Sequence, residues 1–231
     1  MAEDSTGDVA GDAAAGAGQH YFTAQPAAPD ERRRLRVHLA GRSVEVETAR
    51  GVFSAERLDP GTAVLLPHLD AAHEEDAPDE AQGDAPVLDL GCGWGPVALS
   101  LALHRPQRPV WAVDVNERAL DLLRSTAARL GLDAVHCALP DDVPAEVRFA
   151  SIWSNPPIRI GKAELHALLQ RWLPRLRPGG AAHLVVQRNL GADSLHRWLA
   201  EGGVPGTVVE REGSSKGFRV LRVTASGTAP G

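Results

Sequence analysis

A glycine-rich turn at residues 91–95 follows the short apolar run 87–90, which carries Asp89. Because glycine has no Cβ, such a turn can bend sharply and let its backbone approach a ligand closely. A second carboxylate, Asp114, ends the next apolar run, 110–113. A carboxylate at the tip of a strand can accept hydrogen bonds from both hydroxyls of a ribose. The turn and the two acids together predict a nucleoside-binding site.

Two positions favour S-adenosylmethionine over a dinucleotide as the ligand of this turn. The dinucleotide fingerprint requires glycine or alanine where this chain has Pro96. Asp89 precedes the turn, where a carboxylate suits the ammonium group of a methionine better than a pyrophosphate. Cys92 is expected to fill space in the turn and not to act as a nucleophile, because no histidine or other base stands beside it.

A second motif follows the apolar run 149–154 and consists of Asn155, Pro156, Pro157 and Ile158. The prolines fix the backbone and remove N–H donors, which leaves carbonyl oxygens facing outward. The side-chain oxygen of Asn155 and the carbonyl of Pro156 can then accept both hydrogens of one NH2 group. Holding both hydrogens aims a delocalised lone pair at a sulfonium methyl, with no general base. The motif predicts methyl transfer to an exocyclic amine; the alternative is a proline turn that only ends a strand.

Short apolar runs alternate with helical periodicity from residue 87 onward, which predicts an α/β fold with a parallel sheet. The expected strands are 86–90, 109–114, 134–137, 149–154 and 181–187, and the expected helices are about 96–105, 117–131, 162–177 and 192–202. Two antiparallel hairpins are also expected, one at 35–39 and 43–47 and one at 207–210 and 217–223 with a turn at 213–215. Ligands of such sheets bind beyond the carboxyl ends of the strands, where Asn155 would face the turn at 91–95.

Charge is unevenly distributed along the chain, whose net charge is −6. Residues 1–19 and 70–86 hold eleven of the 30 acidic residues and no lysine or arginine. The remainder has 19 acids against 24 bases, a net charge of +5. Such a balance is typical of a surface that binds RNA, and ordinary scatter is the alternative. The segments 1–19 and 226–231 are expected to be disordered tails, and 70–86 a mobile acidic loop.

Several functions are not expected from the composition. Cys92 and Cys137 are the two cysteines, and neither has metal-ligand spacing, so no metal is predicted. No stretch reaches the roughly 18 apolar residues that a bilayer span requires, and the first residues are acidic and small, unlike a secretion signal. The sequence therefore predicts a cytoplasmic protein without a membrane-spanning segment.

The stretch from about residue 20 to 223 resembles the small-domain class I methyltransferases related to the bacterial ribosomal RNA small-subunit guanine-N2 methyltransferases. The resemblance rests on motifs that occur in the family's order, at residues 20–22, 51–54, 89–95, 155–162 and 217–221. It implies one Rossmann-like methyltransferase domain, residues 20–225, with a seven-stranded, mostly parallel sheet that ends in an antiparallel hairpin.

The resemblance also implies a site. The cofactor S-adenosylmethionine is expected at Asp89, Gly91, Cys92, Gly93, Asp114, Val115, Ala138 and Asn155. The target amine is expected at Asn155, Pro156, Pro157 and Ile158. Arg159 and Lys162 follow this loop and are expected to hold a phosphate of RNA, with a solvated helix start as the alternative.

Two positions depart from the family pattern. Many relatives carry an aspartate that reads adenine where this chain has Ala138, so a backbone amide or Asp141 is expected to replace it. Relatives that act on bases often carry an aromatic residue where this chain has Ile158. The predicted function is methylation of guanine N2 in ribosomal RNA. The alternatives are methylation of a protein glutamine at N5, and a non-catalytic RNA-binding protein with the same fold; the oligomeric state is left open.

Overall fold

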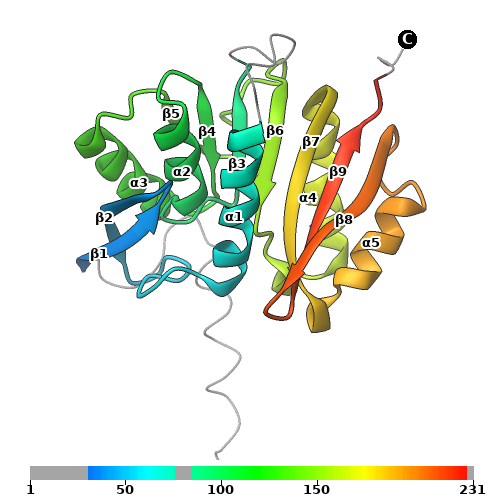
Figure 1. Ribbon diagram of the computed structural model, residues 1–231, viewed down its shortest axis with the longest axis horizontal. Coiled ribbons are helices and arrows are strands. Elements are labelled where there is room, and N and C mark those ends of the chain that lie inside the picture. The colour runs from blue at the N-terminus through cyan, green and yellow to red at the C-terminus, as the bar shows by residue number, and fades with distance from the viewer. Residues whose placement is uncertain (1–30, 76–84, 228–231) are drawn as a thin grey trace, which may run out of the picture.

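The structure, a computed structural model, describes residues 31–75 and 85–227. These residues form a small hairpin and a large central sheet with helices on both faces (Figure 1). The predicted tail at 1–19, the motif at 20–22 and part of the acidic segment lie outside the described residues. The predicted tail at 226–231 is only partly described, and there the Ser226 amide donates a hydrogen bond to the Gly206 carbonyl over 2.8 Å.

The central sheet has seven strands in the order β5-β4-β3-β6-β7-β9-β8. The strands are β3 (Val87–Leu90), β4 (Val110–Val113), β5 (Val135–Ala138), β6 (Phe149–Ser154), β7 (Leu176–Gln187), β8 (Thr207–Ser215) and β9 (Phe218–Ala225). The strands β3 to β7 pair in parallel, and β9 runs antiparallel to both β7 and β8. The chain leaves β3 toward one edge and returns at β6 toward the other, which places a topological switch point between these strands. The predicted seven-stranded, mostly parallel Rossmann-like sheet is confirmed.

The two faces of the sheet are covered by different helices. The helices are α1 (Pro60–Glu75), α2 (Pro96–His104), α3 (Glu117–Leu130), α4 (Lys162–Trp172) and α5 (Ala192–Ala200). One buried cluster joins Leu65 of α1 and Leu120 of α3 with Val87, while a second joins Leu169 of α4 with Leu88. Neighbouring residues of β3 thus enter opposite clusters, as alternation along a strand requires. The helix α3 ends at Gly131, whose φ is 68°, as predicted.

The N-terminal hairpin consists of β1 (Arg32–Leu39) and β2 (Arg42–Ala49), and it confirms the predicted one. Its two-residue turn has positive φ at Ala40 and Gly41, the geometry that matches the twist of paired strands. The hairpin packs beside α3, where the amide of Glu47 donates to the Thr126 hydroxyl over 3.1 Å. The hairpin therefore extends the layer that α1 and α3 form on one face of the sheet, near the carboxyl end of β4.

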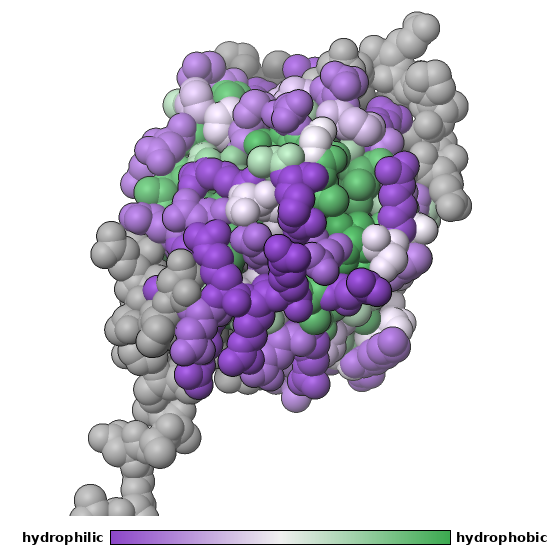
Figure 2. All heavy atoms as spheres, turned by 90° about the vertical axis from the view of Figure 1, so that its left-hand side faces the viewer, coloured by the Kyte–Doolittle hydropathy of each residue, from purple (hydrophilic) through white to green (hydrophobic). Residues whose placement is uncertain are grey.

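The face that the hairpin and α3 present is strongly hydrophilic (Figure 2). Two ion pairs cross the hairpin, Arg32–Glu47 at 3.3 Å and Arg34–Glu45 at 3.2 Å. Surface pairs of this kind contribute little to stability. Exposed arginines of the hairpin and of α3 are Arg32, Arg33, Arg34, Arg36, Arg42, Arg124 and Arg129. This side of the described chain therefore carries many exposed guanidinium groups.

The helix α1 was not predicted, and its last six residues correct the prediction of a loop at 70–86. Asp59 and Pro60 give an ordinary helix start, but Pro67 lies inside the helix and hides its periodicity. Asp70 was expected to belong to the mobile loop. It lies in α1 instead, and its carboxylate pairs with His104 of α2 over 2.7 Å. The rest of the predicted loop, from 76 to 84, lies outside the described residues.

Two boundaries also differ from the prediction. The helix predicted at 162–177 ends at Trp172, because Pro174 cannot continue it, and β7 already begins at Leu176. The turn predicted at 213–215 lies instead at Lys216 and Gly217, both with positive φ. Residue 213 belongs to β8, beyond an irregularity in the register. The shifted turn places Phe218 opposite Gln187 of β7.

Glu212 on β8 gives the fold a pH-dependent contact with two histidines. Its carboxylate lies 2.7 Å from Nδ1 of His183 and 4.0 Å from Nδ1 of His68. Burial alone raises the pKa of Glu212, but the hydrogen bond from His183 and the positive charges of His183, His68 and Arg222 lower that pKa below its ordinary value. A carboxyl group with a depressed pKa adds stability that is present above its unfolded pKa and is lost as pH falls.

We therefore expect Glu212→Gln to lower the free energy of unfolding by about 1 kcal/mol at pH 6. The substitution should also flatten the loss of stability as pH falls from 6 to below the ordinary glutamate pKa of about 4.3, because the lowered pKa of Glu212 delays its protonation in the folded protein. Urea unfolding across this range measures both effects. Equal stability of the two proteins at pH 6 would contradict the expectation, and Glu210→Gln, on the same strand, is the matched control.

Candidate active site

The glycine turn lies at the carboxyl end of β3 and is fixed to the end of β4. The amides of Gly91 and Cys92 donate hydrogen bonds to the Val113 carbonyl over 2.8 and 3.0 Å. A Cβ at Gly95 would lie 2.2 Å from Leu123 Cδ1, so packing against α3 requires glycine there. A Cβ at Gly91 would meet nothing within 4 Å, which leaves open space above that part of the turn. The turn therefore presents bare backbone to a ligand.

Asp89 is buried just before the turn, with 2% of its surface exposed. One carboxylate oxygen accepts a hydrogen bond from the Ala98 amide in the first turn of α2 over 2.9 Å. Burial raises the pKa of Asp89 to about 7, with a further contribution from the charge of Asp114, against the lowering effect of the Ala98 hydrogen bond. A buried carboxyl group of this kind is ionised more readily when a cation lies beside it.

Asp114 follows β4 and connects the turn to the start of α3. Its two oxygens accept hydrogen bonds from the amides of Gly93 at 2.8 Å and Asn116 at 2.9 Å. Burial raises the pKa of Asp114, and these backbone hydrogen bonds oppose the shift. Since each carboxylate oxygen can accept more than one hydrogen bond, capacity remains for two hydroxyl groups.

The structure brings several predicted residues to one hollow at the switch point between β3 and β6. The predicted residues that line it are Asp89, Gly91, Cys92, Gly93 and Asn155. Asp114 is linked to the hollow through Gly93. Val115 and Ala138 do not line it but lie at the ends of β4 and β5, where the Asp114 amide donates to the Ala138 carbonyl over 3.4 Å. Asp141, the suggested reader of adenine, instead pairs with Arg171 over 2.8 Å.

Cys92 lies in the buried part of the turn. Burial raises the pKa of the Cys92 thiol well above its ordinary value, and the charges of Asp114 and Asp89 raise it further. The thiol therefore stays protonated, which agrees with a space-filling role and not with a nucleophile. Within residues 31–75 and 85–227, no group of three or more His, Cys, Asp or Glu side chains could hold a metal ion.

The loop at residues 51–54, one of the motifs on which the family resemblance rests, closes one side of the hollow. The indole of Trp94 donates a hydrogen bond to the Ser54 carbonyl over 3.2 Å, and the side-chain NH2 group of Asn116 donates to the Gly51 carbonyl over 2.8 Å. Phe53 lines the hollow and is 44% exposed. The loop is thus fixed from both the glycine turn and the start of α3.

Asn155 follows β6, and its amide group has two partners that the sequence analysis did not identify. Its Nδ2 donates hydrogen bonds to Oδ1 of Asp59 over 2.6 Å and to the Thr62 hydroxyl over 3.2 Å. Both partners stand at the start of α1, which was itself missed. Among the described residues, no hydrogen bond is made to the side-chain oxygen of Asn155, which leaves this atom available as an acceptor.

The other residues of the reactive loop have separate surroundings. Pro156 is buried, and Ile158 packs against the hydrophobic cluster of α4 and α5 instead of lining the hollow. Ile158 begins a short 3-10 turn, η2 (Ile158–Ile160), and Lys162 is an exposed residue at the start of α4. The side chain of Arg159 is outside the described part of the structure. The predicted grouping therefore holds for Asn155 and not for Ile158.

An aromatic ring does lie beside the reactive loop, but it comes from β9. A Cβ at Gly61 would be 3.2 Å from Nδ2 of Asn155 and 3.1 Å from Cε1 of Phe218. The Phe218 ring and the Asn155 amide therefore flank the same glycine. Only the position of the C-terminal hairpin in the sheet brings this ring to the site, so no local pattern at residue 218 could have predicted it.

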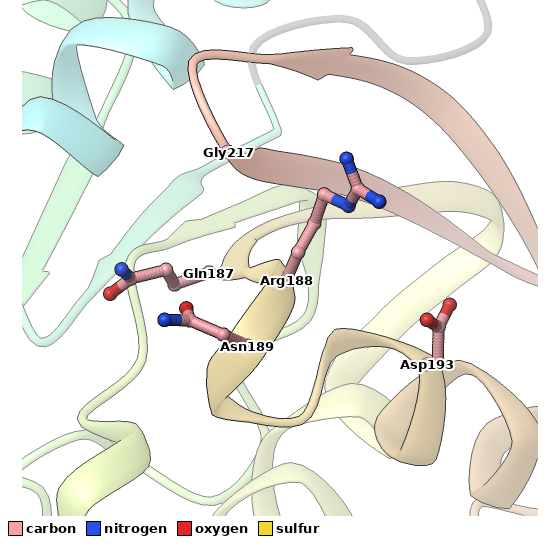
Figure 3. A pocket seen from close by; sticks show the side chains of 5 residues that line it. All are labelled: Gln187, Arg188, Asn189, Asp193 and Gly217. Atoms are coloured by element: carbon pink, nitrogen blue, oxygen red, sulfur yellow. The ribbon is translucent and has the colours of Figure 1, made fainter.

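A larger hollow of about 440 Å³ lies at the carboxyl end of β7, next to the tip of the β8–β9 hairpin. It is lined by Gln187, Arg188, Asn189, Asp193 and Gly217 (Figure 3). The side chains of Gln187 and Asn189 point the same way in this view, while Arg188 and Asp193 point elsewhere. The Arg188 amide donates to the Gly217 carbonyl over 2.9 Å, which joins the two sides of this hollow. Amide, guanidinium and carboxylate groups thus surround a space beside Gly217, the residue that precedes Phe218.

The central sheet has seven strands and a reversed last strand, a glycine turn follows β3, and an acidic residue follows β4. Together these features define a Rossmann-like methyltransferase domain. The chain belongs to the methyltransferase small domain family, whose model matches residues 43–221.

Relatives and solved structures agree with this assignment. The uncharacterized protein YbxB of Bacillus subtilis (strain 168) is 30% identical over 207 residues, which cover 88% of this chain and 97% of that protein. Ribosomal RNA small subunit methyltransferase C of Pseudomonas putida (strain GB-1) is 34% identical over 199 residues, or 83% of this chain and 54% of that protein. This chain therefore spans about half the length of the second relative.

A solved structure of the T. thermophilus 16S rRNA N2 methyltransferase, in complex with AdoMet and guanosine, has the same fold. Its TM-score is 0.65 at 24% identity, covering 86% of this chain and 51% of that one. In the described ranges 31–75 and 85–227, no helix is long and apolar enough to span a membrane.

Proposed function

We propose that this protein transfers the methyl group of S-adenosylmethionine to the exocyclic N2 amine of a guanine in small-subunit ribosomal RNA. The observation that carries the proposal is the position of Asn155. Its amide group is held at the carboxyl end of β6, across the switch point from Asp89 and the glycine turn. The names of the relatives, ribosomal RNA small subunit methyltransferase C, and the guanosine in the T. thermophilus complex support the choice of RNA and of guanine.

The cofactor is S-adenosylmethionine, and the described residues fit its parts. The carboxylate of Asp89 suits the ammonium group of the methionine moiety, and the open space above Gly91 admits the chain of the cofactor. Asp114 suits the ribose hydroxyls. Val115 and Ala138, at the ends of the next strands, would then border the adenine. When bound, the cofactor supplies an electrophilic sulfonium methyl; the protein supplies its position.

Asp114→Ala should weaken S-adenosylmethionine binding by about 1–3 kcal/mol, because paired hydrogen bonds to a charged group are lost. Isothermal titration calorimetry measures the change. Asp121→Ala, an exposed residue of α3, is the matched control and should bind as the wild type does. Because Asp114 also accepts from two backbone amides, the circular dichroism melt of each variant is needed beside the titration. Unchanged affinity in Asp114→Ala would remove this residue from the cofactor site.

The target amine is positioned by hydrogen-bond acceptors and is not deprotonated by a base. The side-chain oxygen of Asn155 and the carbonyl of Pro156 accept its two hydrogens, which turns the nitrogen lone pair toward the methyl group. The proton leaves after the methyl group has been transferred, when the nitrogen is positively charged and acidic. Ile158 is half-buried against the cluster of α4 and α5 and has no aromatic ring with which to stack on a base. Phe218 is half-buried against the other cluster, and its ring, on the other side of Gly61, would offer a stacking surface.

RNA would be held by groups on both sides of the reactive loop. The hollow beside Phe218 presents the amides of Gln187 and Asn189, which can bond to a base or ribose, and the guanidinium of Arg188, which suits a phosphate. Arg159 and Lys162 follow the loop and are the proposed phosphate ligands there. The exposed arginines of the hairpin and α3 provide a further basic surface for the phosphate backbone (Figure 2).

The acceptor class is tested by incubating the protein with methyl-labelled S-adenosylmethionine and three acceptors: small ribosomal subunits, large ribosomal subunits and a ribosome-free protein fraction. The wild type should label the RNA of the small subunit, and Asn155→Ala should label none of the three. Label confined to the protein fraction would overturn the proposal and favour glutamine methylation. Label in none of the three, with S-adenosylmethionine bound, would favour an RNA-binding protein that retains the fold.

A further inference from the structure

Asp59 stands immediately before α1 and makes contacts to two different parts of the chain. Its Oδ1 accepts a hydrogen bond from the Thr62 amide over 3.0 Å, which caps the helix. The same atom accepts from Nδ2 of Asn155 over 2.6 Å, a contact between residues 96 positions apart. The cap belongs to the fold alone. The contact with Asn155 involves the side chain on which the proposed chemistry depends.

We propose that Asp59 is a positioning residue for methyl transfer. Its carboxylate holds the Asn155 amide in the one orientation that presents the amide oxygen to the target amine. The part of this inference that concerns turnover rests on the proposed function. The part that concerns the orientation of Asn155 does not.

The argument starts from the symmetry of an asparagine amide. Its oxygen and its NH2 group have nearly the same shape, so a half-turn of the amide exchanges an acceptor for a donor at little steric cost. In the wrong orientation, the NH2 of Asn155 would face the NH2 of the target, and no hydrogen bond would form between two donors. The clamp therefore needs a group that distinguishes the two orientations.

Asp59 makes that distinction, whereas Thr62 does not. A carboxylate oxygen only accepts hydrogen bonds, so a flipped amide would place its oxygen against the Asp59 oxygen. The Thr62 hydroxyl accepts from Asn155 and donates to Oδ1 of Asp59 over 3.5 Å, but it can turn to donate to a flipped amide, so by itself it tolerates both orientations. A hydrogen bond to a charged acceptor is also stronger than one between neutral groups, and it polarises the amide so that its oxygen accepts more strongly.

Gly61 allows the three side chains to approach one another. A Cβ at this position would lie 3.0 Å from Oδ1 of Asp59, 3.2 Å from Nδ2 of Asn155 and 3.1 Å from Phe218. These distances are tighter than ordinary side-chain contacts, so alanine would press on both partners of the hydrogen bond. The start of α1 thus combines an acidic cap, a residue without a side chain and a second hydroxyl partner at Thr62.

Three substitutions separate the cap from the contact with Asn155. Asp59→Ser keeps a good cap for the Thr62 amide, but its hydroxyl is too short to reach Asn155. Asp59→Ala removes both interactions. Asp59→Asn keeps an acceptor of the same length without the charge, and its own amide can also turn to meet a flipped Asn155. Asp70→Ser, which breaks the pair with His104 further along α1, is the matched control for a general weakening of the helix.

The orientation is read first, without any substrate. Side-chain amide signals of uniformly 15N-labelled protein are recorded by NMR, and the Asn155 signal is assigned by its loss in Asn155→Ala. In the wild type and in Asp70→Ser, one Asn155 amide proton should be shifted downfield and protected from exchange with water. Asp59→Ser should lose both properties with little change in melting temperature. An Asn155 signal that is the same in Asp59→Ser and the wild type would overturn the proposal.

Turnover is then measured as a double-mutant cycle on small-subunit RNA that lacks the methyl group. Asp59→Ser should lower kcat at least about tenfold with little change in KM, and Asp59→Asn should fall between it and the wild type. In an Asn155→Ala background, Asp59→Ser should have no further effect, because its partner is already gone. Independent, multiplying losses would assign Asp59 a structural role and overturn the inference. If the wild type itself methylates no RNA, the proposed function fails while the NMR result still decides the role of Asp59.

Discussion

Replacing Asn155 with alanine should lower turnover at least about a hundredfold while S-adenosylmethionine binds nearly as it does to the wild type. In the proposed mechanism, the side-chain oxygen of Asn155 accepts a hydrogen bond from the target amine, and this bond is strongest when the nitrogen becomes tetrahedral and positively charged. A group of this kind stabilises the transition state more than the ground state, so its loss lowers kcat and not cofactor affinity.

Single-turnover rates and calorimetric titration with S-adenosylmethionine separate the two quantities for Asn155→Ala. Gln170→Ala, which removes an exposed side-chain amide on α4, is the matched control and should keep its chemical rate. Equal single-turnover rates in Asn155→Ala and the wild type would exclude the proposed clamp on the amine. A loss of cofactor affinity as large as the loss of rate would assign Asn155 to the cofactor site instead.

The affinity for S-adenosylmethionine should fall about tenfold for each pH unit below about pH 7. In the protein without ligand, burial raises the pKa of Asp89 to about 7, so the carboxyl is neutral below that pH. The ammonium group of the cofactor needs the ionised carboxylate, whose pKa it lowers on binding. Binding below pH 7 must therefore expel a proton from Asp89, which weakens the observed affinity as pH falls.

Calorimetry between pH 5.5 and 8 in buffers of different ionisation enthalpy measures both the affinity and the released proton. Asp89→Asn should bind more weakly at pH 8 and lose most of the dependence on pH. Asp114→Asn serves as the comparison, because burial also raises the pKa of Asp114. An affinity of the wild type that is constant over this range would separate Asp89 from the ammonium group.

Local patterns were enough to predict most of the central sheet. The apolar runs that became β3, β4 and β6 are short and bounded by turn residues, and the glycine at 131 ends α3 where periodicity stops. These features are decided within a few residues of sequence. The helix α1 was missed for the converse reason, because Pro67 interrupts its pattern and the helix is held by packing on the sheet. The same packing made the loop prediction wrong for residues 70–75.

Non-local pairing explains the remaining differences. The turn at 213–215 looked suitable because it contains glycine, but the register of β9 against β7 places the reversal at Lys216 and Gly217. That register also brings Phe218 to the reactive loop. The contact between Asp59 and Asn155 depends on α1 packing on the face of the sheet with its start beside the end of β6, so residue types and spacing could not reveal it.

In the candidate site, too, local motifs predicted the position of some residues, while the folded chain decides the position of others. Asp89, Gly91, Cys92, Gly93 and Asn155 were predicted from two contiguous motifs and line one hollow. Ile158 was assigned to the site from its place in the motif, and the 3-10 turn that follows the prolines holds it half-buried against the cluster of α4 and α5. The roles of all these residues toward the cofactor and the target amine stay predictions, as do those of Asp114, Val115, Ala138, Pro156 and Pro157, and of Arg159 and Lys162 toward RNA.

The central claim is that the methyl group is attached to an exocyclic amine of guanine, and the labelled nucleoside tests it most directly. Small-subunit RNA labelled by the wild type is digested to nucleosides, which are separated by chromatography and identified by mass spectrometry against synthetic standards. We predict that the label is found in N2-methylguanosine. Label in a nucleoside methylated on a ring nitrogen, a ring carbon or the ribose would contradict the account, because a clamp that holds the two hydrogens of an NH2 group acts on none of these atoms.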